Sequence, residues 1–300
     1  MIQLSHEDIK TFVETQLACW PMAKANYDAL RNVSRRVLRV AGHDFILQHN
    51  PARIRSTAAK VDSASVSGRP CFLCRANRPA EQLICGIKNG WEMLVNPYPI
   101  LPIHLTIVSN AHRPQEKVPE DIAEIATALP GMAVFFNGAS AGASAPDHLH
   151  LQAVLKDELP LVRLVEKYHN EGDHGLKVSA DLLPDFPYLF FSGVVGPDMS
   201  ELKTLVAGLN LGGPSCDGSY SDQALANKIF WLGEGGTLRF IVIPRKAHRP
   251  GCFYKEGKER RLVSPGTIDM AGMLILPDAA DFDSLTSEEL LEIFSDVAIQ

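Results

Sequence analysis

Apolar and polar positions along the chain form patterns that divide it into short strands and helices. Period-two or continuous apolar runs predict strands at residues 36–48, 91–95, 103–109, 132–137, 148–154, 186–195 and 228–243. Amphipathic spacing predicts helices at 6–31, 119–129, 158–169 and 285–299. Ser5 and Thr286 are N-cap candidates for the first and last helices, and Glu289 completes a capping box. Residues 50–70 are basic and polar, which predicts an exposed loop.

An internal echo suggests that the chain contains two related half-units. The sequence LTIVSNAHRP (105–114) returns as RFIVIPRKAHRP (239–250), an apolar strand followed by Ala-His-Arg-Pro. Further on, SPGTIDMAGMLILP (264–277) stands where SAPDHLHLQAVL (144–155) stands in the first half. We therefore expect a catalytic half at 1–170 and a degenerate half at 171–300 that completes the substrate cleft. Chance recurrence of a tetrapeptide is the alternative.

The stretch GASAGASAPDHLHLQAV (138–154) carries the strongest candidate chemistry. In a strand, side chains alternate between faces, so His148, His150 and Gln152 share one face and the apolar residues between them face the core. Imidazole is a good nucleophile toward phosphorus at neutral pH, because much of it is unprotonated. The small residues before the strand let backbone N–H groups approach a phosphate closely. A structural strand with incidental histidines is the alternative.

Cys71-x-x-Cys74 has the spacing of two thiolates on one metal ion. A redox pair and two buried thiols are the alternatives. Six cysteines are too few in 300 residues to indicate a disulfide scaffold, so a cytoplasmic protein with reduced thiols is expected.

Composition limits the classes of partner. The net charge of −6 argues against an extended nucleic-acid surface, although a local basic pocket for a phosphorylated ligand is compatible with it. No apolar run approaches the ~20 residues of a membrane span, and the start lacks a signal-peptide pattern. We expect neither nucleic acid nor membrane as a partner, and the sequence does not decide between a monomer and a homodimer.

These motifs resemble the transferase branch of the histidine triad superfamily. FNGASAGASAPDHLHLQ (136–152) is similar to its active-site segment, a small-residue loop followed by His-x-His-x-Gln. HNPARIRS (49–56), RPCFLCRANRP (69–79) and VNPYPILPIHLTIVSNAHRP (95–114) resemble its Asn-Pro, Cys-x-x-Cys and Pro-x-His segments. The branch includes galactose-1-phosphate uridylyltransferase, diadenosine tetraphosphate phosphorylase and the GDP-hexose phosphorylases, and the form DHLHLQ looks closest to the last. The resemblance implies an α+β fold of antiparallel sheets with flanking helices.

The resemblance also implies roles for individual residues. His150 would be the nucleophile that forms a nucleotidyl-histidine, and Gln152 would hold the phosphoryl oxygens. The zinc ligands of the family match a set of four residues here, with His104 as a rival ligand: Cys71, Cys74, His112 and His148. The residues expected to bind substrate are Asn96, Asn137, Gly142, Ser144, Arg53, Arg55 and Lys60. Apart from the resemblance, His248 of the second Ala-His-Arg-Pro copy is a candidate for lining the cleft from the second half, together with Arg245, Lys246 and Arg249.

The expected function is nucleotidyl transfer or phosphorolysis of a nucleoside diphosphate sugar or a dinucleoside polyphosphate. Gln152 replaces the third histidine of the hydrolases in this superfamily, which favours phosphate or a sugar phosphate as acceptor over water. A nucleotide hydrolase and a zinc-stabilised nucleotide-binding protein without turnover are the alternatives.

Overall fold

The computed structural model describes residues 3–58, 65–66, 68–88, 90–168, 175–195 and 225–300, except the side chains of 55, 56 and 234. Its helices are α1 (His6–Cys19), α2 (Pro21–Ala29), α3 (Ile54–Thr57), α5 (Ile122–Ala128), α6 (Pro160–Tyr168), α7 (Ser179–Leu182), α9 (Thr267–Met270), α10 (Ala279–Ser284) and α11 (Ser287–Val297). Its strands are β1 (Ser34–Val40), β2 (His43–His49), β3 (Cys85–Lys88), β4 (Trp91–Val95), β5 (His104–Ser109), β6 (Met132–Asn137), β7 (His150–Leu155), β8 (Lys177–Val178), β9 (Phe191–Val194), β10 (Ala226–Leu232), β11 (Leu238–Pro244) and β12 (Met273–Leu276).

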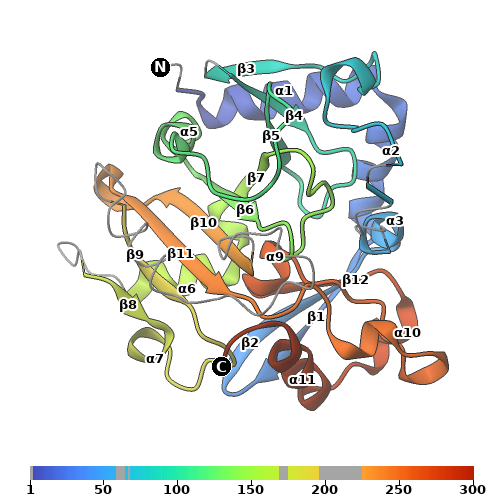
Figure 1. Ribbon diagram of the computed structural model, residues 1–300, viewed down its shortest axis with the longest axis vertical. Coiled ribbons are helices and arrows are strands. Elements are labelled where there is room, and N and C mark those ends of the chain that lie inside the picture. Colours follow the sequence, from blue (N-terminus) through green and yellow to red (C-terminus); the bar gives the residue numbers. More distant parts are fainter. Residues whose placement is uncertain (1–2, 59–64, 67, 89, 169–174, 196–224) are drawn as a thin grey trace.

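A large antiparallel sheet organises the molecule (Figure 1). Its strand order is β3-β4-β5-β7-β6-β10-β11-β9-β8. Successive residues of β6 face opposite cores: Ala133 and Phe135 enter one, and Val134 and Phe136 enter the other. Helices α1 and α5 contribute to the second core, while α6, α9 and α11 contribute to the first. The expected α+β fold of antiparallel sheets with flanking helices is confirmed.

The large sheet repeats one strand arrangement. From its centre outward, the order is β6-β7-β5-β4 on one side and β10-β11-β9-β8 on the other, and β6 pairs with β10 antiparallel. Strands β4 to β7 thus correspond in chain order to β8 to β11, and every neighbouring pair is antiparallel. This is the topology expected of two related half-units. The domain boundary at residue 170 stays a prediction.

The repeated tetrapeptide that suggested two half-units follows strands that do not occupy equivalent positions in the sheet. Ala-His-Arg-Pro follows β5 in the first half and β11 in the second, but β11 occupies the position of β7. The proposed match of 264–277 to 144–155 is also wrong, because β12 pairs in parallel with β2 and not with β11. After β11 the chain leaves the large sheet and completes a small one.

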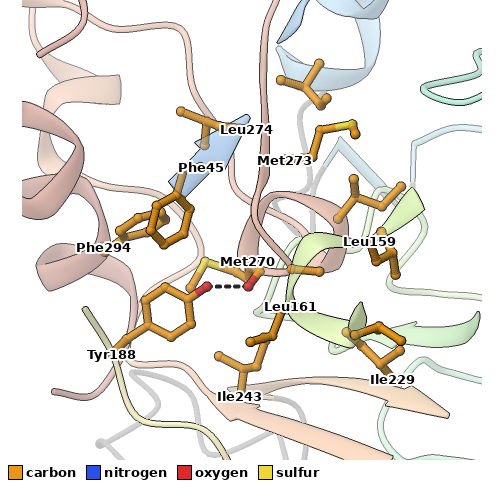
Figure 2. Close-up of a cluster of buried hydrophobic side chains, with 14 of the residues drawn as sticks. Phe45, Leu159, Leu161, Tyr188, Ile229, Ile243, Met270, Met273, Leu274 and Phe294 are labelled. Atoms are coloured by element: carbon orange, nitrogen blue, oxygen red, sulfur yellow. Dashed lines mark hydrogen bonds between the residues drawn. The ribbon is translucent and has the colours of Figure 1, made fainter. Parts of the chain in front are cut away.

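That small sheet joins the two ends of the chain. Its order is β1-β2-β12, and it packs with α10 and α11 at the bottom of the molecule as drawn (Figure 1). Figure 2 shows the core beneath it, where Phe45 of β2 packs beside Phe294 of α11 with ring centroids 4.9 Å apart. Tyr188 is buried in the same core and donates its hydroxyl hydrogen to the Met270 carbonyl oxygen. Strands β1 and β2 therefore share one core with the C-terminal elements β12 and α11.

Local predictions differ from the structure in several places, including the strand expected at 186–195, which covers only Phe191–Val194. The helix expected at 6–31 breaks at Trp20 (φ −124°, ψ 91°), because Pro21 lacks the N–H that would continue α1 and instead begins α2. The loop expected at 50–70 begins with helical turns, a 3₁₀ turn at Pro51–Arg53 followed by α3. The strand expected from 148 begins only at His150. The capping boxes at Ser5 and Thr286 are both present.

Candidate functional site

Strand β7 presents His150 and Gln152 on one face of the large sheet. Leu149, Leu151 and Ala153 enter the core on the opposite face, as the alternating pattern predicts. His148 precedes the strand, so it does not extend the row of polar side chains on that face. It turns instead toward Cys71, and this separates the two histidines into two sites.

His150 is held as a neutral imidazole with a defined tautomer. Its side chain is buried, with 3% of its surface exposed, and burial lowers the pKa of His150 to about 4. Nδ1 lies 2.8 Å from the His148 carbonyl oxygen, which only accepts hydrogen bonds, so Nδ1 carries the proton. The lone pair is therefore on Nε2. An imidazole in this state is a nucleophile at neutral pH.

Gln115 fixes the backbone of His150, a role that sequence reasoning missed. Its Oε1 accepts from the His150 N–H at 2.8 Å, and its Nε2 donates to the His150 carbonyl oxygen at 2.8 Å. The same Nε2 donates to the Asn137 carbonyl oxygen at 2.9 Å, at the end of β6. Gln115 is fully buried and so takes the place of a strand partner where β6 and β7 separate.

A second chain of hydrogen bonds orients the amide of Gln152. The Ile100 N–H donates to His104 Nδ1 at 3.2 Å, so the ring proton of His104 is on Nε2. That Nε2–H donates to Gln152 Oε1 at 2.7 Å. Burial lowers the pKa of His104 to about 3, which keeps this ring neutral. With Oε1 engaged, the NH₂ group of Gln152 is the part of the amide that remains to donate to a ligand.

The small-residue loop before β7 packs directly against the second half. Gly142 has φ +94°, and a Cβ there would lie 2.7 Å from the Gly266 Cα. The Gly142 N–H donates to His248 Nδ1 at 3.4 Å, and Asn227 donates to the Ala141 carbonyl oxygen at 2.7 Å. Glycine at 142 therefore meets both a positive φ and a close approach. Residues from the second half hold the loop in place beside the site.

Three other residues expected to bind substrate, Ser144, Asn96 and Asn137, lie at the same site. Ser144 lines the cavities described below. Asn96 lines only the larger of them, and it donates to Thr106 Oγ1 at 3.2 Å. The amide oxygen of Asn137 accepts at 2.8 Å from both the backbone N–H and the hydroxyl of Thr267, so it joins the two halves.

The structure describes the three basic residues expected to bind substrate, Arg53, Arg55 and Lys60, to different extents. Arg53 is not on an exposed loop, because its Nη1 donates to the Tyr98 carbonyl oxygen at 2.6 Å and its Nε is buried. Arg55 is described only by its backbone, in α3, and Lys60 lies outside the described residues.

His150 and Gln152 line a cavity of about 640 Å³. A small-molecule site typically has about 300–1,000 Å³. Aromatic and aliphatic side chains form much of its wall, namely Trp20, Met22, Phe72, Leu73, Leu94 and Tyr98. These residues come from distant parts of the sequence, so no local sequence pattern predicted that they line a common cavity. The cavity combines a broad apolar wall with a polar floor.

Four residues beside this cavity form a candidate metal centre. One ligand atom from each of Cys71, Cys74, His112 and His148 lies within 4.8 Å of all the others. Cys71 Sγ is 3.3 Å and Cys74 Sγ is 3.6 Å from His148 Nδ1, and Cys74 Sγ is 3.2 Å from His112 Nδ1. The rival ligand His104 is engaged with Gln152 instead.

The donor set fits a tetrahedral zinc ion. Zinc bonds of about 2.3 Å to sulfur and about 2.0 Å to nitrogen place neighbouring sulfur and nitrogen ligands about 3.5 Å apart. His148 Nε2 donates to the Ser109 carbonyl oxygen at 2.8 Å, which directs the Nδ1 lone pair at the two sulfur atoms. A backbone carbonyl on the other nitrogen is a usual support for a metal-ligating histidine.

Comparison with known proteins places the fold. A family profile described as a domain of unknown function (DUF4922) matches residues 12–155, a range that contains the Cys/His cluster and ends with β7. No curated protein matches the chain. The solved yeast Ap4A phosphorylase Apa2 superposes with a TM-score of 0.58 at 15% identity, covering 93% of this chain and 96% of that chain. This chain has the Apa2 fold.

Two ligand complexes of the same yeast enzyme superpose on this chain to a similar extent. The complex with AMP gives a TM-score of 0.60 at 14% identity, covering 99% of this chain and 97% of that one. The complex with Ap4A gives 0.60 at 18% identity, covering 99% and 98%. At these identities the likeness shows the fold, and it agrees with the α+β fold that the resemblance implied. Among the described residues, no helix is long and apolar enough to cross a membrane.

Proposed function

We propose that the protein transfers a nucleotidyl group through His150, with a dinucleoside polyphosphate or a nucleoside diphosphate sugar as donor. The observation that carries this proposal is the state of His150. Its ring is neutral, its lone pair is on Nε2, and it lines a cavity of nucleoside size. Apa2, whose structures include complexes with AMP and Ap4A, supports the dinucleoside polyphosphate as donor class.

In the first step, His150 Nε2 attacks the α-phosphorus of the donor. A nitrogen–phosphorus bond forms, and the bond from phosphorus to the bridging oxygen breaks, so the distal phosphate or sugar phosphate leaves with the bonding electrons. The proton stays on Nδ1, which donates to the His148 carbonyl oxygen, and this hydrogen bond stabilises the positive charge that the ring acquires. The NH₂ group of Gln152 donates to a non-bridging oxygen, where negative charge develops.

In the second step, an oxygen of the acceptor attacks the same phosphorus and His150 leaves as neutral imidazole. The Gln152 amide does not titrate over the accessible pH range, so it cannot act as a general base that activates a water molecule. An acceptor that is already an anion, such as phosphate or a sugar phosphate, needs no general base. The product with phosphate is a nucleoside diphosphate.

We further propose that Cys71, Cys74, His112 and His148 hold a structural zinc ion. Four protein ligands leave no open position for water, so zinc there stabilises structure and takes no part in the reaction. Its ligands hold Phe72 and Leu73 between them, and both of these side chains line the large cavity. The metal centre would thus support one wall of the nucleoside site.

The proposal is tested by product analysis with a panel of dinucleoside polyphosphates and ADP-, GDP- and UDP-sugars. A thermal-shift screen selects the donor, since a ligand at 100 times its Kd stabilises the folded state by about 2.7 kcal/mol. With that donor, nucleoside diphosphate release should rise with phosphate concentration and vanish in His150→Asn. Nucleoside monophosphate release at a rate independent of phosphate would indicate a hydrolase. Binding without any release would indicate a nucleotide-binding protein.

A further inference from the structure

A second, smaller cavity adjoins the large one where the two halves of the chain meet. It has a volume of about 60 Å³ and shares Arg53, Ser144 and Gln152 with the large cavity. The second half contributes His248 and Arg249 to its wall. The echo of Ala-His-Arg-Pro after β11 therefore lines a cavity, although it is not the structural equivalent of the first copy.

The charges around this cavity favour an anion. Arg249 Nε donates to Ser264 Oγ at 2.9 Å, and its Nη2 donates to the Thr57 carbonyl oxygen at 3.1 Å, so its guanidinium spans both halves. The one carboxylate in the wall, Asp269, accepts from the backbone N–H groups of Gly266 and Ile275, both at 2.8 Å. Two guanidinium groups thus face one carboxylate whose oxygens are already engaged.

Arg53 supplies the observation that points most directly to a ligand. Its Nη1 donates to the Tyr98 carbonyl oxygen, but its Nε is buried and has no hydrogen-bond partner among the described residues. A buried cationic N–H without an acceptor is unfavourable, and folded proteins rarely leave one unpaired. An oxyanion in the adjoining cavity would supply that acceptor.

Size narrows the class of anion. A cavity of about 10–15 Å³ holds one water molecule. A cavity of about 60 Å³ therefore holds four to six non-hydrogen atoms. Orthophosphate has five. His248 adds a donor of fixed tautomer, because its Nδ1 accepts from the Gly142 N–H and its ring proton is therefore on Nε2.

We propose that this cavity, between Arg53 and Arg249, is the subsite for the acceptor phosphate. The proposal rests on the proposed function, since it names where the attacking phosphate binds. Gln152 and Ser144 border both cavities, so a phosphate in the small one lies next to a phosphorus attached to His150. The second half of the chain thereby supplies a residue for acceptor choice.

Binding of inorganic phosphate to the full-length protein is the first test, because it requires no turnover. Calorimetric titration of the wild-type protein should show saturable binding at one site per chain. Arg249→Gln should weaken phosphate binding at least tenfold, and Arg249→Lys should restore part of it. Lys258→Gln is the matched control, since Lys258 is an exposed cation nine residues away that lines neither cavity. Absence of saturable phosphate binding, or equal affinity in Arg249→Gln, overturns the subsite.

A second variant covers the case in which Arg249→Gln does not fold. Arg53→Gln removes the buried unpaired N–H, so it should weaken phosphate binding at least tenfold, while the loss of the Nη1 hydrogen bond to Tyr98 should lower thermal stability only modestly. A large loss of stability with unchanged phosphate affinity would show that Arg53 has a structural role only, which also overturns the proposal.

The kinetic test separates this inference from the proposed function. The nucleotidyl adduct is formed with donor alone and then chased with increasing phosphate in a rapid-quench instrument. The phosphate concentration for half-maximal discharge should rise at least tenfold in Arg249→Gln and stay unchanged in Lys258→Gln. An unchanged value in Arg249→Gln overturns the subsite and leaves nucleotidyl transfer standing. No adduct in the wild type, with phosphate still bound, refutes nucleotidyl transfer and the acceptor role together.

Discussion

Replacing Gln115 with leucine should disable His150 without touching it. Gln115 makes three hydrogen bonds, two to the His150 backbone and one to the Asn137 carbonyl oxygen, and all of them are buried. Leucine fills a similar volume and satisfies none of these groups. The change leaves one N–H and two carbonyl oxygens without partners at the start of β7.

The magnitude follows from the groups left unpaired. Each buried backbone group without a partner costs about 1–3 kcal/mol, so the three groups left by Gln115→Leu should lower the free energy of unfolding by about 3 kcal/mol or more. In a chain of this size that corresponds to a fall in Tm of about 10 °C. Misplacement of a reacting group by about 1 Å costs on the order of 10²-fold in rate. We therefore expect adduct formation to slow by about that factor.

The assay is single-turnover formation of the nucleotidyl adduct at a temperature where the variant is fully folded. Leu290→Ala is the matched control for stability, because Leu290 is fully buried in α11 and its truncation costs about 2–5 kcal/mol. The control should keep the wild-type rate. A wild-type rate in Gln115→Leu, or an equal loss in Leu290→Ala, would refute the positioning role.

Three further outcomes are expected. Cys71→Ser should reduce zinc from about one ion per chain to none by elemental analysis and cost several kcal/mol of stability. His104 has a pKa of about 3 in the folded protein, so only the unfolded chain takes up its proton below about pH 6.5. As the pH drops from about 6.5 toward 3, His104 should thus lower the free energy of unfolding by about 1.4 kcal/mol per pH unit. Urea titrations of His104→Gln should lack this contribution to the slope. Gly142→Ala should lower Tm and donor affinity, because its Cβ would meet Gly266.

Periodic segments were predictable from the sequence, and side chains in irregular segments were not. Strand β4 has the expected bounds because its apolar run is continuous, and β5 differs by one residue. His148 was placed in the strand because alternation alone does not show where a strand begins. Here the turn at His148 directs its ring to the cysteines.

The parts of the site that were missed depend on contacts between distant residues. Gln115 is one of several polar residues in its loop, and its partner His150 is 35 positions away, so no local pattern distinguishes it. The apolar wall of the cavity is assembled from dispersed aromatic residues such as Trp20 and Phe72. By contrast, motif spacing predicted Cys71 and Cys74, and the family resemblance added His112 and His148, so all four members of the Cys/His cluster were expected from the sequence.

The central claim is that His150 becomes covalently nucleotidylated, and intact-protein mass spectrometry tests it most directly. The protein is incubated with Ap4A, and in parallel with nucleoside diphosphate sugars, in the absence of phosphate and then quenched in alkali, where a phosphoramidate survives. We predict a mass increase of one nucleotidyl group per chain, discharged by added phosphate and absent in His150→Asn. No mass increase with any donor, or an adduct that persists in His150→Asn, would contradict the account.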